Sequence, residues 1–103
     1  MTGVLANAYG DSQWSKSAID QKIGAVFWRN WTSVEGAYGP EETEVLFDVI
    51  DRYKEAVKGK SVLVVGSETP WVESIILAIG AKHVTTLEYN KIKTNHPKVN
   101  KDA

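Results

Sequence analysis

The residues best placed to do chemistry are a glycine and a glutamate that end two short β-branched segments. Gly66 follows residues 61–65, and Glu88 ends residues 83–88, 22 positions after the glycine. In an open parallel sheet, ligands bind beyond the carboxyl ends of the strands, and a glycine there lets the backbone approach the ligand closely. A carboxylate about 20 residues further on accepts hydrogen bonds from ribose hydroxyl groups. The spacing therefore predicts a nucleoside-binding corner.

Structural explanations for the same residues stay open. Any tight strand-to-helix turn requires a glycine at the place of Gly66. A solvated carboxylate at the end of a strand explains Glu88 equally well. Glu68 and Glu73 are interpreted as charges at the start of a helix, because acidic groups are favourable there.

These residues need a strand-helix-strand unit to position them. Residues 61–65 form a β-branched run typical of a strand buried on both faces. Thr69 and Pro70 predict the start of a helix over residues 71–79, and Gly80 predicts its end. A second β-branched strand follows over residues 83–88. Elements of these lengths imply a parallel crossover and an α/β fold.

Two helices are predicted before this unit. Residues 17–20 have the form of a capping box, which would start the first of them. The second helix covers residues 41–57, with Pro40 at its first position and Gly59 after its end. Its predicted core-facing stripe consists of Val45, Leu46, Val49, Ile50, Tyr53 and Val57. The predicted organisation is a flexible segment over 1–15, a domain over 16–90 and a polar basic tail over 91–103.

A family resemblance covers roughly residues 28–98. The segments VLVVGSETP (62–70), AIGAK (78–82) and VTTLE (84–88) resemble the first two motifs of class I, S-adenosylmethionine-dependent methyltransferases. The segments 35–44 and 62–73 are more closely similar to a nematode family of unknown function with a methyltransferase-like fold. The resemblance implies N-terminal helices followed by a Rossmann-like β-α-β unit with an incomplete parallel sheet, as in an N-terminal fragment. It also implies S-adenosylmethionine as cofactor, with Gly66 and Glu88 as the two matching contacts, and Ser67 is a further cofactor-binding candidate because of its hydroxyl group.

The chain departs from the methyltransferase pattern at three positions. Val64 replaces the usual acidic residue, while Glu68 and Pro70 replace the second and third glycines. A carboxylate at 68 adds negative charge near the place of the cofactor's own carboxylate, and Pro70 removes one N–H group. No counterpart of the later motifs precedes Ala103. The leading hypothesis is therefore weak S-adenosylmethionine or nucleoside binding without catalysis by this chain alone, and no catalytic residue is assigned.

The alternative hypothesis is a non-catalytic protein-interaction module. It would use an aromatic cluster of Phe27, Trp28 and Trp31 together with an exposed edge of the strand over 62–65. Large aromatic side chains supply much of the burial in cores and interfaces. An unpaired strand edge templates pairing with another chain, so self-association or a protein partner is expected.

Composition narrows the remaining classes of function. The net charge of −1 argues against a nucleic-acid partner. The chain has no cysteine, and its two histidines, His83 and His96, lack carboxylates at ligand spacing, so no metal site is predicted. The longest apolar run is too short to span a bilayer, and the N-terminus does not resemble a secretory signal. A soluble, cytoplasmic protein is expected.

Overall fold

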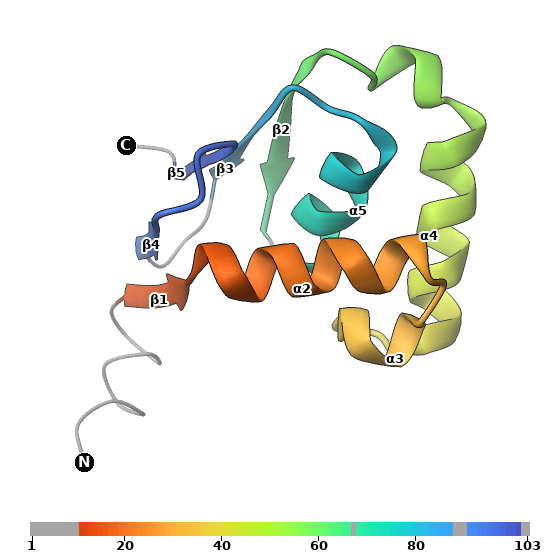
Figure 1. The fold of residues 1–103 in the computed structure, drawn as a ribbon, viewed down its shortest axis with the longest axis horizontal. Helices are drawn as coiled ribbons and strands as arrows, with labels where there is room; N and C mark the ends of the chain where they lie inside the picture. The colour runs from red at the N-terminus through yellow and green to blue at the C-terminus, as the bar shows by residue number, and fades with distance from the viewer. Residues whose placement is uncertain (1–10, 67, 88–90, 102–103) are drawn as a thin grey trace.

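The structure of the protein is a computed structural model that describes residues 11–66, 68–87 and 91–101. The elements before the sheet are β1 (Asp11–Trp14), α2 (Lys16–Phe27), α3 (Trp31–Val34), α4 (Pro40–Arg52) and the short 3-10 helix η1 (Lys54–Ala56). They are followed by β2 (Ser61–Val65), α5 (Trp71–Ile79), β3 (His83–Leu87), β4 (Lys91–Thr94) and β5 (Val99–Lys101) (Figure 1). Helices precede a parallel β-α-β unit, so the predicted α/β class is confirmed. Among the described residues, no helix is long and apolar enough to cross a membrane.

A three-stranded parallel sheet has the order β2-β3-β5. Its register pairs Val62 with Val84, and Val84 in turn with Val99. A separate parallel pair joins β1 to β4, from Asp11 opposite Lys91 to Trp14 opposite Thr94. Among the described strands, β2 therefore lies at one edge of the main sheet.

The C-terminal segment contributes to the fold, although the sequence predicts a polar tail there. Val99 of β5 is only 4% exposed and packs with Trp14 and Ile19. Trp14, likewise, lies within the segment predicted to be flexible and is buried. This cluster could not be predicted from the sequence, because its members are isolated apolar residues that belong to no periodic pattern.

One face of the sheet is covered and the other is open. α5 packs on β2 and β3, and α2 and α4 pack against α5. Val64 and Val84 on the α5 side are buried, whereas the intervening Leu63 and Val65 are 60% and 68% exposed. The prediction that β2 is buried on both faces is wrong. Its β-branched composition suits a pleated strand on either face, but the described helices cover only one.

The α2 and α4 helices differ in detail from their predictions. Ser15 is the N-cap of α2, and its Oγ accepts a hydrogen bond from the backbone N–H of Ala18 at 3.0 Å, so the cap lies two residues before the predicted one. α4 begins at Pro40 as predicted but ends at Arg52. It buries Thr43 and Phe47 and partly buries Leu46 and Ile50; Val45, Val49 and Tyr53 of the predicted stripe are exposed.

Contacts from other elements explain the orientation of α4. The ring centroids of Phe47 and Trp31 are 5.2 Å apart, and the guanidinium carbon of Arg29 lies 4.3 Å from the Phe47 ring centroid. The helix also passes close to Gly36, where an added Cβ would collide with Thr43 Oγ1. These contacts turn Phe47 inward, and that direction cannot be inferred from the periodicity of α4 alone.

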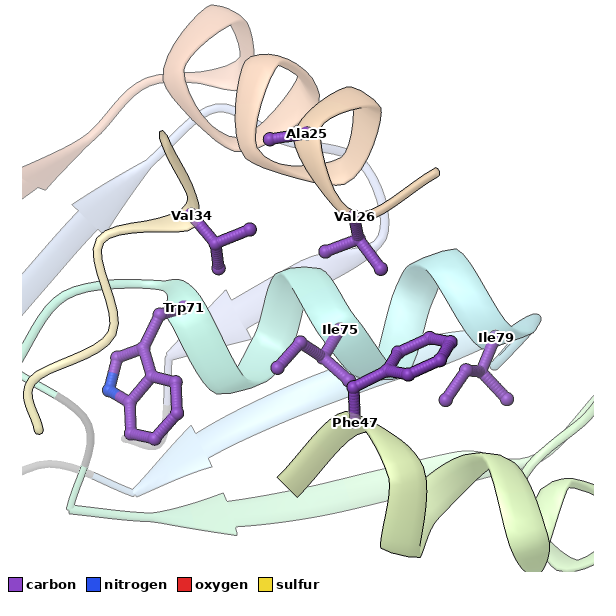
Figure 2. Close-up of a cluster of buried hydrophobic side chains, with 7 residues drawn as sticks. All are labelled: Ala25, Val26, Val34, Phe47, Trp71, Ile75 and Ile79. Atoms are coloured by element: carbon purple, nitrogen blue, oxygen red, sulfur yellow. The ribbon is translucent and has the colours of Figure 1, made fainter. Parts of the chain in front are cut away.

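The largest buried cluster joins four helices. Figure 2 shows Phe47 of α4 and Val34 of α3 directed toward α5, with side chains of α2 closing the cluster above them. Its members are Ala25, Val26, Val34, Phe47, Trp71, Ile75 and Ile79. α5 is thus held between this cluster and the sheet, and its position determines where the loop after β2 runs.

Candidate functional site

The candidate site is the carboxyl edge of β2 and β3. Gly66 follows β2 with a φ of +81°, a conformation that L residues with side chains rarely adopt. Its backbone N–H donates to Leu87 O at 2.9 Å, so the two strand ends are held together at this point. An added Cβ at Gly66 would have no atom within 4 Å. The glycine is therefore required by its conformation, and the space beside it is open.

The start of α5 forms the second side of this edge. Pro70 occupies the N-cap position, and no side-chain hydrogen bond caps the helix. The Trp71 N–H donates to Thr69 O at 2.9 Å, and the Ser74 N–H donates to Pro70 O at 3.0 Å. Glu68 and Thr69 are exposed beside this turn. The turn is thus ordered by backbone contacts, with its polar side chains directed to solvent.

A buried carboxylate lies beneath the same edge. Glu73, in the first turn of α5, is fully buried, and its Oε2 accepts a hydrogen bond from the buried Thr86 Oγ1 at 2.7 Å. Glu73 thus lies in the first turn of α5, as predicted for a helix-start charge, but its carboxylate is buried rather than exposed to solvent. The burial of Glu73 could have been predicted, because position 73 lies one turn before Ile76 and thus on the sheet-facing side of α5. The contact anchors β3 one residue before its end at Leu87.

Of the other candidate positions, two lie outside the described residues and two are buried in the core. Ser67 and Glu88 lie outside the described residues. Val64, at the position that is usually acidic in methyltransferases, is buried against α5. Trp71 is buried in the helical cluster and meets Tyr38 edge-on at 6.3 Å between ring centroids. Trp71 therefore packs against protein side chains.

The aromatic cluster of the alternative hypothesis is not found. Trp28 is 85% exposed and Phe27 is also largely exposed at the end of α2. Trp31 is half-buried and turns toward Phe47 of α4. Within the described part of the chain, these three side chains do not gather into one surface.

A second polar constellation was missed by the sequence analysis. His96 Nε2 lies 2.9 Å from Asp20 Oδ1, although the residues are far apart in the chain. His96 Nδ1 accepts the Lys98 N–H at 3.1 Å, so the ring proton is on Nε2 and is donated to Asp20. Lys16 Nζ also donates to Asp20, at 2.6 Å. The pKa of Asp20 is lowered, chiefly by the hydrogen bond from Lys16 and further by that from His96.

The Asp20–His96 pair is a structural contact. Both ring nitrogens of His96 are already engaged, so neither is available to activate a nucleophile. The pair ties α2 to the turn between β4 and β5, which Asn95 Oδ1 also joins by accepting the Lys16 N–H at 2.7 Å. Among the described residues, no group of three carboxylates or histidines could hold a metal ion.

Comparison with known proteins gives no relative from which a role could be transferred. No family model matches the chain, no curated protein is similar to it, and no solved structure matches it.

Proposed function

We propose that the carboxyl edge of β2 and β3 is a weak nucleoside-binding corner of a methyltransferase-like domain, with S-adenosylmethionine as its ligand. The observation that carries the proposal is Gly66. It stands at the end of a parallel strand, directly before the helix-start turn, with a positive φ and open space where a side chain would be. Backbone in that conformation and place permits close approach of a ligand.

The strand order supports this location. In one half of a doubly wound sheet the strands lie in the order 3-2-1, and ligands bind at the switch point beside strand 1. The order β5-β3-β2 corresponds to that half, so β2 takes the place of strand 1. Gly66 follows β2 and therefore lies at the position that corresponds to the switch point.

Catalysis by this chain alone is not part of the proposal. Methyl transfer from a sulfonium depends on positioning the reactants and excluding water. The described residues beside Gly66 are solvent-facing, with Glu68 and Thr69 exposed. Val64 and Pro70 also depart from the cofactor-binding pattern. We therefore propose that the ligand binds to one solvent-exposed surface of the chain and that the chain alone does not catalyse methyl transfer.

Two glycines provide a matched test of the binding proposal. Gly66 and Gly59 both have positive φ, +81° and +71°, and an added Cβ meets nothing within 4 Å at either. Alanine should strain the backbone equally at both, by about 1–2 kcal/mol. Gly59 precedes β2, so only Gly66→Ala changes the candidate corner.

Isothermal titration with S-adenosylmethionine and S-adenosylhomocysteine measures the outcome. We expect weak binding by the parent chain, unchanged binding by Gly59→Ala, and weaker binding by Gly66→Ala and by Glu88→Ala. Ligand that binds only the folded chain must also raise its melting temperature. Absence of heat and of thermal stabilisation at saturating ligand, or equal losses for the two glycine variants, would refute the proposed corner.

The second candidate function is a protein-interaction module. Its aromatic cluster is not found, but the open face of the sheet favours its other element, the exposed edge of β2.

A further inference from the structure

The buried Glu73–Thr86 pair adjoins the Gly66 corner. Thr86 and Leu87 are the last two residues of β3. The Thr86 hydroxyl donates to Glu73 Oε2 at 2.7 Å, and the Leu87 backbone oxygen accepts the Gly66 N–H at 2.9 Å. The first turn of α5 is therefore linked, through the end of β3, to the residue that follows β2.

These two hydrogen bonds complete a closed ring of contacts at the corner. The chain runs from Gly66 to Glu73 through the turn that begins α5, and the hydrogen bonds lead back from Glu73 to Gly66 through β3. The Glu73 contact joins α5 to β3 through polar atoms, whereas Val84 of β3 and Ile76 of α5 belong to an apolar cluster. A hydrogen bond has a preferred length and direction, so it fixes the spacing of the two elements more narrowly than apolar packing does.

Stability alone does not explain a carboxylate at this place. Glu73 and Thr86 are 0% and 1% exposed. Desolvation of a buried carboxylate offsets much of what its hydrogen bonds contribute to stability. Apolar side chains of the same shape can be equally stable in such a place. The pair is therefore better suited to fixing geometry than to adding stability.

We propose that Glu73 is a positioning residue, which acts through Thr86 to hold the Gly66 turn in the geometry that accepts a nucleoside. The proposal rests on the nucleoside-binding function proposed for Gly66. Glu73 is fully buried, so it acts on the corner without touching the ligand. A preformed site avoids the loss of affinity that comes from ordering the site on binding, and a weak ligand depends on this most.

The amide proton of Gly66 reports the geometry of the corner without any ligand. Thr86→Val removes the hydroxyl but keeps the shape of the side chain, and it should move the Gly66 amide resonance upfield as the hydrogen bond to Leu87 O lengthens. Thr86→Ser keeps the hydroxyl and should leave the resonance near its parent position. Val84→Ala is the matched control, because it weakens the packing of α5 on β3 but removes no polar group.

Isothermal titration with S-adenosylmethionine, at a temperature at which every variant is folded, measures the consequence for binding. Thr86→Val should raise the Kd about tenfold, which corresponds to about one hydrogen bond. Thr86→Ser and Val84→Ala should raise it less than about twofold, although Val84→Ala also lowers the melting temperature. Glu73→Met should weaken binding as well. Its effect combined with Thr86→Val should be less than additive, because both variants remove the same contact.

The failures of the two proposals can be told apart. A Gly66 resonance that Thr86→Val leaves in place would overturn the positioning role. So would equal losses of binding for Thr86→Val and Val84→Ala, because both losses would then follow from stability. A parent chain that binds no S-adenosylmethionine would instead refute the nucleoside corner, and the role of Glu73 in binding would fall with it.

Discussion

The two faces of the β2-β3-β5 sheet have opposite surroundings although neighbouring residues supply them. On the covered face, Val64, Val84 and Thr86 meet α5, and α5 is itself held by the cluster in Figure 2. On the open face, Leu63 and Val65 are mostly exposed and Leu87 is 40% exposed. The composition of the two faces of β2 is nearly the same. The difference teaches that burial of a β-branched strand is decided by the elements packed on it rather than by the strand itself.

The largest expected effect compares apolar residues on the two faces. Val84→Ala removes methyl groups from a fully buried site and should lower the free energy of unfolding by about 2 kcal/mol. Val65→Ala makes the same chemical change on the open face and should cost less than about 0.5 kcal/mol. Urea denaturation of the two variants and the parent chain measures both effects. Equal losses would show that something covers the open face in solution.

An intermediate effect compares two adjacent threonines. Thr86→Val removes the donor to the buried Glu73 carboxylate and should cost about 1–2 kcal/mol. Thr85→Val removes a hydrogen bond of 3.0 Å to Asn100 Oδ1 at an exposed position, and should cost about 0.5 kcal/mol or less. The two variants are isosteric with the parent, so their denaturation midpoints compare the polar groups directly. If Thr86→Val were as mild as Thr85→Val, the Glu73–Thr86 contact would not contribute to the stability of the sheet.

The smallest effect concerns the contact that fixes the last strand to α2. The folded state lowers the pKa of Asp20, chiefly through Lys16, so ionised Asp20 adds stability above its unfolded pKa, near 4. That contribution is lost as the pH falls through the lower, folded pKa. Because 44% of the Asp20 side chain is exposed, we expect less than about 1 kcal/mol.

Asp20→Asn should reduce this acid sensitivity. Denaturation midpoints measured from pH 3 to pH 7 should converge for the parent and the variant toward the acid end. A difference that stays constant over the whole range would assign the effect to geometry rather than to the charge of Asp20.

The central unit of the fold could be predicted because its signals are local. A β-branched run, the turn residues Gly66 and Pro70, and the stop at Gly80 define β2, α5 and the start of β3 within a short stretch. Burial could not be predicted in the same way. The inward rotation of Phe47 depends on Trp31 from another helix, and β5 is recruited by Trp14 and Ile19 from the opposite part of the chain.

The candidate site was predictable to a smaller extent. The turn at Gly66 could be predicted because a backbone position with positive φ usually requires glycine. Glu73 was correctly placed at the start of a helix, and its burial could also have been predicted from the helical period. The His96–Asp20 contact could not be predicted from the sequence, because neither residue belongs to a local pattern and the two are separated by most of the chain.

The pairing of β1 with β4 has a consequence for the order of folding. Asp11 lies opposite Lys91, so this small sheet closes a loop of nearly the whole chain. Such contacts form late, because the entropy of loop closure is lost before the contact can repay it. During synthesis, α2 must therefore emerge long before the residues that secure its first turn. Until residues 91–99 leave the ribosome, Trp14 and Ile19 lack the Val99 side chain that buries them, and the nascent chain exposes an apolar surface to chaperones.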